Sequence, residues 1–241
     1  MLQDPNVRVE AGGVPAGAAR EESRAGLPGA PILSALEAIF LLVVILYYIW
    51  VLDPASAMYG WPSYALFMGF ATVSHLLRRE RPADLGIRLD NMGVALLEAL
   101  AVVLPALVVG FAIGRFMEGG RSMNLERLSA TFLNLYPWAL FQQYGLQCIF
   151  GRRLAGVLPD PVGHDVVCAG IFAALHLPNP FLTVVTFGAG YCWCVLFRRR
   201  PNLFALAASH ALSSAALYYC LPPAITHLMR VGPGYLLSVR V

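Results

Sequence analysis

Polar side chains interrupt three apolar segments of this chain, and their types suit a hydrogen-bonding or metal-binding site. The first segment contains Gln142, Gln143 and Gln147, the second contains His176, and the third contains His210. Gln143 and Gln147 are four residues apart and share a helix face, whereas Gln142 lies about 100° round the helix. Neutral imidazole is both a base and a metal ligand, while a carboxamide only donates and accepts hydrogen bonds. If the three segments pack together, the amides and imidazoles meet in one cavity.

Each of these residues also has a purely structural interpretation. Gln, His and Ser in membrane-spanning helices often do no more than hydrogen-bond to a neighbouring helix, which contributes about 0.6–2 kcal/mol each. For one residue alone we would favour that role, but three glutamines and two histidines together indicate a site. Glu37 and Glu98 are the carboxylates that lie well inside apolar segments, and we expect each to face a neighbouring helix. Asp165 is expected at the start of a helix.

The composition excludes an ordinary water-soluble chain. Of the 241 residues, 58% are apolar and 13% are charged, against roughly 45–50% and 25% in typical globular domains. The mean hydropathy is +0.65. Such a chain cannot cover its surface with polar groups, so we predict a polytopic, all-α integral membrane protein with the lipid bilayer around it. The net charge of +3 is carried by arginines at the ends of apolar segments, which argues against a nucleic-acid partner.

The apolar segments have lengths near the roughly 20 residues that a bilayer demands of a helix. They predict about seven transmembrane helices, at 31–52, 63–77, 92–114, 131–150, 165–177, 181–197 and 203–221. Residues 1–30 are rich in Gly, Ala, Pro and scattered charges, which predicts a flexible cytoplasmic tail. The predicted transmembrane domain therefore covers residues 31–221, and residues 222–241 form a C-terminal tail.

The distribution of arginine predicts the orientation of the chain. With the N-terminus in the cytoplasm, 12 of the 17 arginines lie in the tail and the inner loops, and five lie in the outer segments. Cytoplasmic loops carry an excess of basic residues, so we predict a cytoplasmic N-terminus and, with seven spans, an outer C-terminus. The expected location is the bacterial inner (cytoplasmic) membrane.

Three sequence marks resemble those of the CPBP (also called Abi) family of intramembrane proteases, which includes the CAAX prenyl endopeptidases. That family has a Glu-Glu-x-x-x-Arg run, a Phe-x-x-x-His and a His-x-x-x-Asn or His-x-x-x-Asp on successive helices. Here Phe172-x-x-x-His176 matches the second mark, and His210-x-x-x-Ser214 takes the place of the third. The segment 137–147 has the setting of the first mark, with Gln at its three key positions. The resemblance covers about residues 82–220.

The resemblance implies a CPBP-like helical bundle whose motif residues face a cavity inside the membrane. In the family, the first Glu and a His are proposed to activate water for attack on a peptide bond. By position, Gln142 stands for that base, Gln143 for the second Glu and Gln147 for the Arg. His176 and His210 are kept, and Ser214 replaces the Asn. Because a carboxamide cannot act as a general base, the resemblance implies a site that has been neutralised as a unit.

Three functions compete on this basis. The first is a catalytically altered pseudo-protease that acts as a membrane scaffold, chaperone or subunit of a larger complex, with another membrane protein as partner. The second is a working intramembrane endopeptidase that uses His176 and His210 as base or as ligands of a metal, zinc being the candidate. The third is a binding protein in which the same two histidines hold a haem or other cofactor between helices.

Overall fold

The computed structural model describes residues 30–52, 57–117 and 121–239, and this part of the chain is all-helical, without strands. The predicted tail 1–30 lies outside it, except for its last residue. The long helices are α2 (Ala30–Val51), α3 (Ala57–Leu77), α4 (Met92–Phe116), α5 (Leu125–Gln143), α7 (Pro161–Ala174), α8 (Pro180–Arg199) and α9 (Leu203–Cys220). The shorter elements are η1 (Pro82–Leu85), η2 (Tyr144–Gly151), α6 (Arg152–Ala155), α10 (Pro223–Thr226), η3 (His227–Met229) and α11 (Gly232–Val239).

Four of the described helices, α2, α4, α8 and α9, are long and apolar enough to cross a membrane. This confirms the expectation of an all-α chain and indicates an integral membrane protein. The other three predicted ranges also fall on helices, but with different bounds. Range 131–150 begins inside α5 and continues through η2, whose π-helical turns follow α5 without a break. Range 165–177 extends beyond α7, which ends at Ala174.

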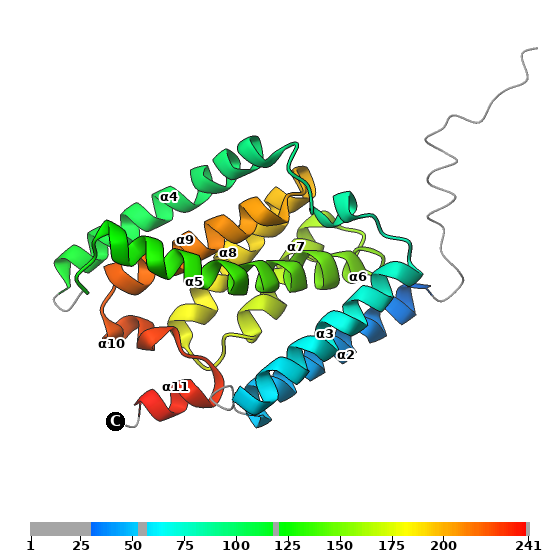
Figure 1. Ribbon diagram of the computed structural model, residues 1–241, viewed down its shortest axis with the longest axis horizontal. Helices are drawn as coiled ribbons and strands as arrows, with labels where there is room; N and C mark the ends of the chain where they lie inside the picture. Colours follow the sequence, from blue (N-terminus) through cyan, green and yellow to red (C-terminus); the bar gives the residue numbers. More distant parts are fainter. Residues whose placement is uncertain (1–29, 53–56, 118–120, 240–241) are drawn as a thin grey trace, which may run out of the picture.

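Helix α9 is packed between α4 and α5, and α7 pairs with α8 behind them (Figure 1). Small residues allow this close approach, since Ala205, Ala207, Ala211 and Ala215 of α9 are all fully buried. At the C-terminal end of α9, a Cβ placed on Gly114 of α4 would lie 1.9 Å from the carbonyl oxygen of Cys220. Small residues at such interfaces bring helix backbones together in membranes. The α4–α5–α9 layer therefore depends on residues without bulky side chains.

Helices α2 and α3 run side by side at the edge of the molecule (Figure 1). Aromatic pairs join them, with ring centroids 5.2 Å apart for Phe40 and Phe70 and 5.9 Å apart for Tyr48 and Tyr64. Tyr64 also packs edge-on against Phe141 of α5, with centroids 5.0 Å apart. The α2–α3 pair thus forms a wall that contacts the rest of the bundle partly through aromatic side chains.

Polar residues fix where several helices begin. The side-chain oxygens of four residues accept hydrogen bonds from backbone N–H groups three residues later: Asn124, Asp160, Asn179 and Asn202. Such caps satisfy donors that the first helical turn leaves open. The expectation that Asp165 begins a helix is wrong, because Asp160 is the cap and Pro161 the first residue of α7. Asp165 lies one turn further on, is 1% exposed and binds Arg198 with Oδ2.

Candidate functional site

The six residues singled out by the sequence lie on α5, η2 and α9 and in the turn between α7 and α8. Gln142 and Gln143 end helix α5, and Gln147 follows in η2. His210 and Ser214 lie one turn apart on α9, which packs along α5. His176 lies in the turn between α7 and α8, just beyond the end of α7. The fold therefore brings all three motif segments together.

A chain of hydrogen bonds runs from η2 to α9. The Nε2 of Gln147 donates to Oε1 of Gln143 over 3.3 Å, and Nε2 of Gln143 lies 3.4 Å from Nδ1 of His210. Gln143 is fully buried and Gln147 is 3% exposed. Because an amide nitrogen only donates, Nδ1 of His210 accepts, and its proton is carried on Nε2. The two glutamines therefore fix the orientation and the tautomer of this imidazole.

His176 is held in the opposite tautomer. Its Nδ1 lies 2.7 Å from the carbonyl oxygen of Phe172. A carbonyl oxygen only accepts a hydrogen bond, so Nδ1 carries the proton and Nε2 keeps its lone pair. The ring of Phe172 packs edge-on against both imidazoles, with centroids 4.8 Å from His176 and 5.9 Å from His210. One imidazole thus offers an acceptor and the other a donor.

Trp193 of α8 supports His210 from behind, and the sequence reasoning missed it. Its indole packs on the imidazole with centroids 4.6 Å apart, and its Nε1 donates to Oγ of Ser209 over 3.1 Å. Both Trp193 and Ser209 are buried. No local sequence pattern could have linked Trp193 to His210, since they belong to different helices. The position of His210 is therefore set by three helices together.

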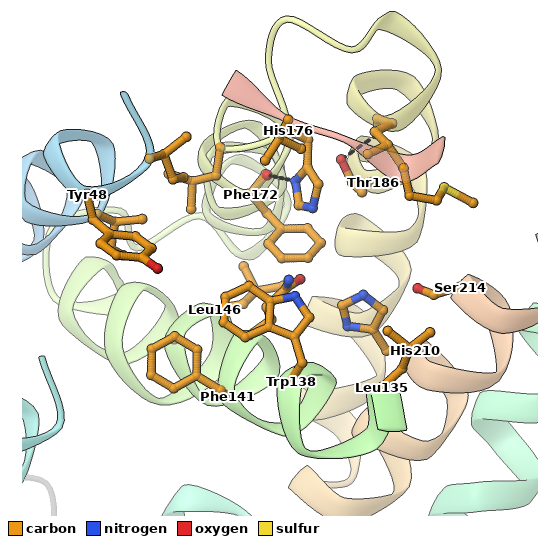
Figure 2. A pocket seen from close by; sticks show the side chains of 18 of the residues that line it. Tyr48, Leu135, Trp138, Phe141, Leu146, Phe172, His176, Thr186, His210 and Ser214 are labelled. Carbon is orange, nitrogen blue, oxygen red and sulfur yellow. Dashed lines mark hydrogen bonds between the residues drawn. The ribbon is translucent and has the colours of Figure 1, made fainter. Parts of the chain in front are cut away.

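Four of the six predicted residues line a cavity of about 800 Å³: Gln142, His176, His210 and Ser214. Gln143 and Gln147 lie behind this lining and act through His210. Figure 2 shows the two histidines and Ser214 on one side of the cavity, the aromatic rings of Tyr48 and Phe141 on the other, and Trp138 between them. No Asp or Glu of the described chain belongs to the lining. The cavity is therefore largely apolar, with one polar, uncharged edge.

The donor set does not fit a zinc site. Zinc is held by three or four nitrogen, sulfur or carboxylate ligands, and the described residues contain no group of three His, Cys, Asp or Glu side chains that could hold a metal. At the cavity, His176 offers a free Nε2, but Nε2 of His210 carries a proton in the observed hydrogen-bond arrangement. Oε1 of Gln142 is buried without a hydrogen-bond partner among the described residues, yet an amide oxygen is a weak zinc ligand.

A second polar cluster joins α2, α3 and α6, and the sequence reasoning missed it as a unit. We define the ionic cluster as Glu37, Ser74, His75, Arg78, Glu80, Arg152 and Arg153. The Arg153 side chain is 1% exposed and lies at the centre. As expected, Glu37 faces its neighbouring helix, since Ser74 donates to it and Arg78 binds it over 2.8 Å. Glu98 likewise faces a neighbouring segment, where it binds Arg200.

The environment of Glu80 fixes its charge. Burial by itself would raise the pKa of this carboxyl, but hydrogen bonds from His75, Arg153 and Arg152 hold the pKa well below its usual range. Nε of Arg152 lies 2.8 Å from Oε1 of Glu80, and Nη1 of Arg153 lies 2.9 Å from the same oxygen. Glu80 is therefore ionised at neutral pH and can hold the two arginines.

No protein-family model, curated protein or solved structure matches this chain. The functional argument therefore rests on the residues at the cavity and on the way the helices place them. Those residues form an uncharged hydrogen-bonding edge in an apolar cavity, which suits binding better than acid–base chemistry.

Proposed function

We propose that this protein is a CPBP-like intramembrane protein whose protease-type site has lost its chemistry and binds another membrane protein. The observation that carries the proposal is the convergence of the six motif positions at one cavity whose described lining contains no carboxylate. In the family that the chain resembles, the positions of Gln142, Gln143 and Gln147 hold the two acids and the Arg. The protein would act as a membrane scaffold, a chaperone or a subunit of a larger complex.

The proposal includes seven membrane-crossing segments with the N-terminus in the cytoplasm of a bacterial cell. Three further spans, formed by α3, by α5 with η2, and by α7, would bring the four apolar helices to seven. Contacts at the ends of the helices support this arrangement. The arginine-rich ends meet each other, as Arg78 and Arg153 do at Glu37, while Arg121 contacts the carbonyl oxygen of Tyr218 at the far end of α9. Basic residues on one face are typical of the cytoplasmic side.

The geometry argues against water activation by the glutamines at the motif positions. A general base must accept a proton, but Gln143 uses its amide nitrogen toward His210 and its oxygen toward Gln147. Gln142 offers an amide oxygen with no useful basicity. What remains is a pair of hydrogen-bonding imidazoles beside an apolar wall. Such an edge can bind one polar group of an otherwise apolar partner segment.

One observation favours the alternative of a working endopeptidase. Nε2 of His176 keeps its lone pair at the cavity, because Nδ1 is the nitrogen bonded to the carbonyl of Phe172. In that alternative His176 takes the proton from water, and the amide of Gln142 orients the water or the oxyanion. A peptide cleavage that is abolished in His176→Ala would establish it and overturn the pseudo-protease proposal.

The proposal is tested by native purification in mild detergent, with quantification of co-purifying membrane proteins. The matched variants are Leu135→Trp, which places an indole in the cavity that Leu135 lines, and Leu133→Trp on the same helix. Leu133 is 67% exposed on the outer face of the bundle. We expect a stoichiometric partner that Leu135→Trp displaces and Leu133→Trp retains. A partner retained equally in both variants would show that the cavity does not bind it.

A further inference from the structure

The chain after α9 folds back over the cavity. We define the strap as residues 222–234, which include α10, η3 and the start of α11. Three apolar residues of the strap, Leu228, Met229 and Val231, belong to the cavity lining together with His176 and His210. Part of the cavity wall is therefore supplied by a segment that follows the last long helix.

Main-chain groups of the strap are hydrogen-bonded to the turn that carries His176. Nδ2 of Asn179 donates to the carbonyl oxygens of Thr226 and Arg230, each over 3.0 Å, and Asn179 is fully buried. The N–H of Gly232 donates to the carbonyl oxygen of Leu177 over 2.9 Å. Because Oδ1 of Asn179 also caps α8 at Leu182, the fastening group is itself held rigidly. A few bonds at one place therefore keep the strap closed.

The strap's backbone is strained where it meets the cavity. His227, Leu228 and Met229 have φ values of +46°, +58° and +58°, in the left-handed region that residues other than Gly rarely adopt. Strain of this kind persists only when surrounding contacts impose it. Loss of the fastening bonds would therefore release a backbone that favours another conformation.

Gly232 is the position where the strap lies against Ile49 of α2, in the α2–α3 wall. Its φ is +55°, and a Cβ there would lie 2.8 Å from Cγ2 of Ile49 and 3.2 Å from the Ile49 carbonyl oxygen. Any side chain at this position would push the strap away from α2. Gly234, two residues further along α11, has nothing within 4 Å of its Cβ position.

We propose that the strap is a releasable cover that controls access to the cavity beside His176. Closed, it fills part of the cavity with Leu228 and Met229. Released from Asn179 and Leu177, it opens the cavity at the end where His176 lies. The inference rests on the proposed function only in taking this cavity as the binding site, because opening can be measured without any partner.

The test measures how fast a small thiol reagent labels a cysteine placed in the cavity by Ser214→Cys, in membranes, with site-resolved mass spectrometry. The matched pair in this background is Gly232→Ala and Gly234→Ala. We expect Gly232→Ala to raise labelling at position 214 by about tenfold, as for the loss of one or two hydrogen bonds. Gly234→Ala should leave it unchanged. The native thiols of Cys148 and Cys168 are fully buried and should stay unlabelled throughout.

A second matched pair keeps the helix caps intact. Asn179→Asp retains the capping oxygen of α8 but replaces the donor that holds the strap, and we again expect about a tenfold increase. Asn202→Asp makes the same change at α9, where Nδ2 donates to the carbonyl of Arg88 and to Asn91, away from the strap. This control should not change labelling. If Gly232→Ala unfolds the protein and exposes Cys148, the comparison of Asn179→Asp with Asn202→Asp decides whether the strap controls access to the cavity.

Unchanged labelling at position 214 in folded Gly232→Ala and Asn179→Asp variants would overturn the proposal that the strap is a releasable cover. Failure of the proposed function would look different. Faster labelling, without a partner that responds to Leu135→Trp, would support the releasable cover and contradict the binding role of the cavity. A partner that does respond, combined with unchanged labelling, would support the binding role and overturn the strap.

Discussion

Replacement of Arg153 by Met should destabilise the protein strongly, because this buried guanidinium holds three elements together. Nε of Arg153 lies 2.8 Å from Oε1 of Glu37, Nη1 lies 2.9 Å from Oε1 of Glu80, and Nη2 lies 2.8 Å from Oγ of Ser74. Glu37 belongs to α2, Ser74 to α3, and Arg153 to α6. The substitution keeps an apolar stem of similar length and removes only the charged, donating end.

The size of this destabilisation depends on which partners the carboxylates of Glu37 and Glu80 retain. Removal of one partner of a buried ion pair costs about 3–5 kcal/mol. After Arg153→Met, Glu37 retains Arg78, and Glu80 retains Arg152, so neither carboxylate is left alone. We therefore expect the lower limit, about 3 kcal/mol, which corresponds to a fall in the apparent Tm of about 6–12 °C for a chain of this size.

The matched control is Arg152→Gln. The Arg152 side chain is 28% exposed and pairs with Glu80, which keeps Arg153, so the cost should be below about 1 kcal/mol. Thermal unfolding in mild detergent, followed by the reaction of buried native thiols with a fluorogenic maleimide, measures both variants. If Arg153→Met lowered the apparent Tm no more than Arg152→Gln does, the ionic cluster would not fasten α2 and α3 to the bundle.

Three further predictions use the same unfolding assay. Gly114→Ala should lower the apparent Tm by several degrees, because its Cβ would lie 1.9 Å from a carbonyl oxygen of α9, whereas Gly170→Ala, with nothing within 4 Å, should not. Gln143→Leu leaves His210 Nδ1 without its buried donor and should cost about 1–3 kcal/mol; an unchanged Tm would refute the hydrogen-bond chain. The folded pKa of Glu80 is lowered, so its contribution to stability is complete above the unfolded pKa of about 4.3 and is lost as pH falls from there through the folded pKa. Glu80→Gln should therefore flatten the loss of stability in acid.

The sequence predicts where the helices lie because the length and composition of apolar segments are local properties. It is less reliable at helix ends. Helix α5 begins at Leu125 rather than 131, since Asn124 caps a first turn that contains Glu126, and charged residues hide that turn from a search for apolar segments. Helix α7 ends at Ala174, and Pro178 and Pro180, which follow closely, restrict continuation of a helix.

The candidate site was predictable because its members are polar residues in apolar surroundings. The residues that support it were not, because their roles arise from contacts between distant parts of the chain. Arg153 binds Glu37 across 116 positions, and Asn179 binds the carbonyl of Arg230 across 51. Arg153 resembles any arginine at the end of an apolar segment, and Asn179 resembles an ordinary helix cap. Their second partners are set by the packing of helices and leave no local pattern.

The ionic cluster and the strap contact the α2–α3 wall at opposite ends, and these two attachments differ in strength. At one end, three elements share the buried Arg153. At the other end, the strap contacts α2, where Gly232 lies against Ile49, and the strap is held by hydrogen bonds from the side chain of Asn179 and to the carbonyl oxygen of Leu177. Local openings begin where few buried contacts must be lost. Opening should therefore start at the strap and leave the ionic cluster closed, so Arg153→Met should affect stability more than access to the cavity, and Gly232→Ala should do the reverse.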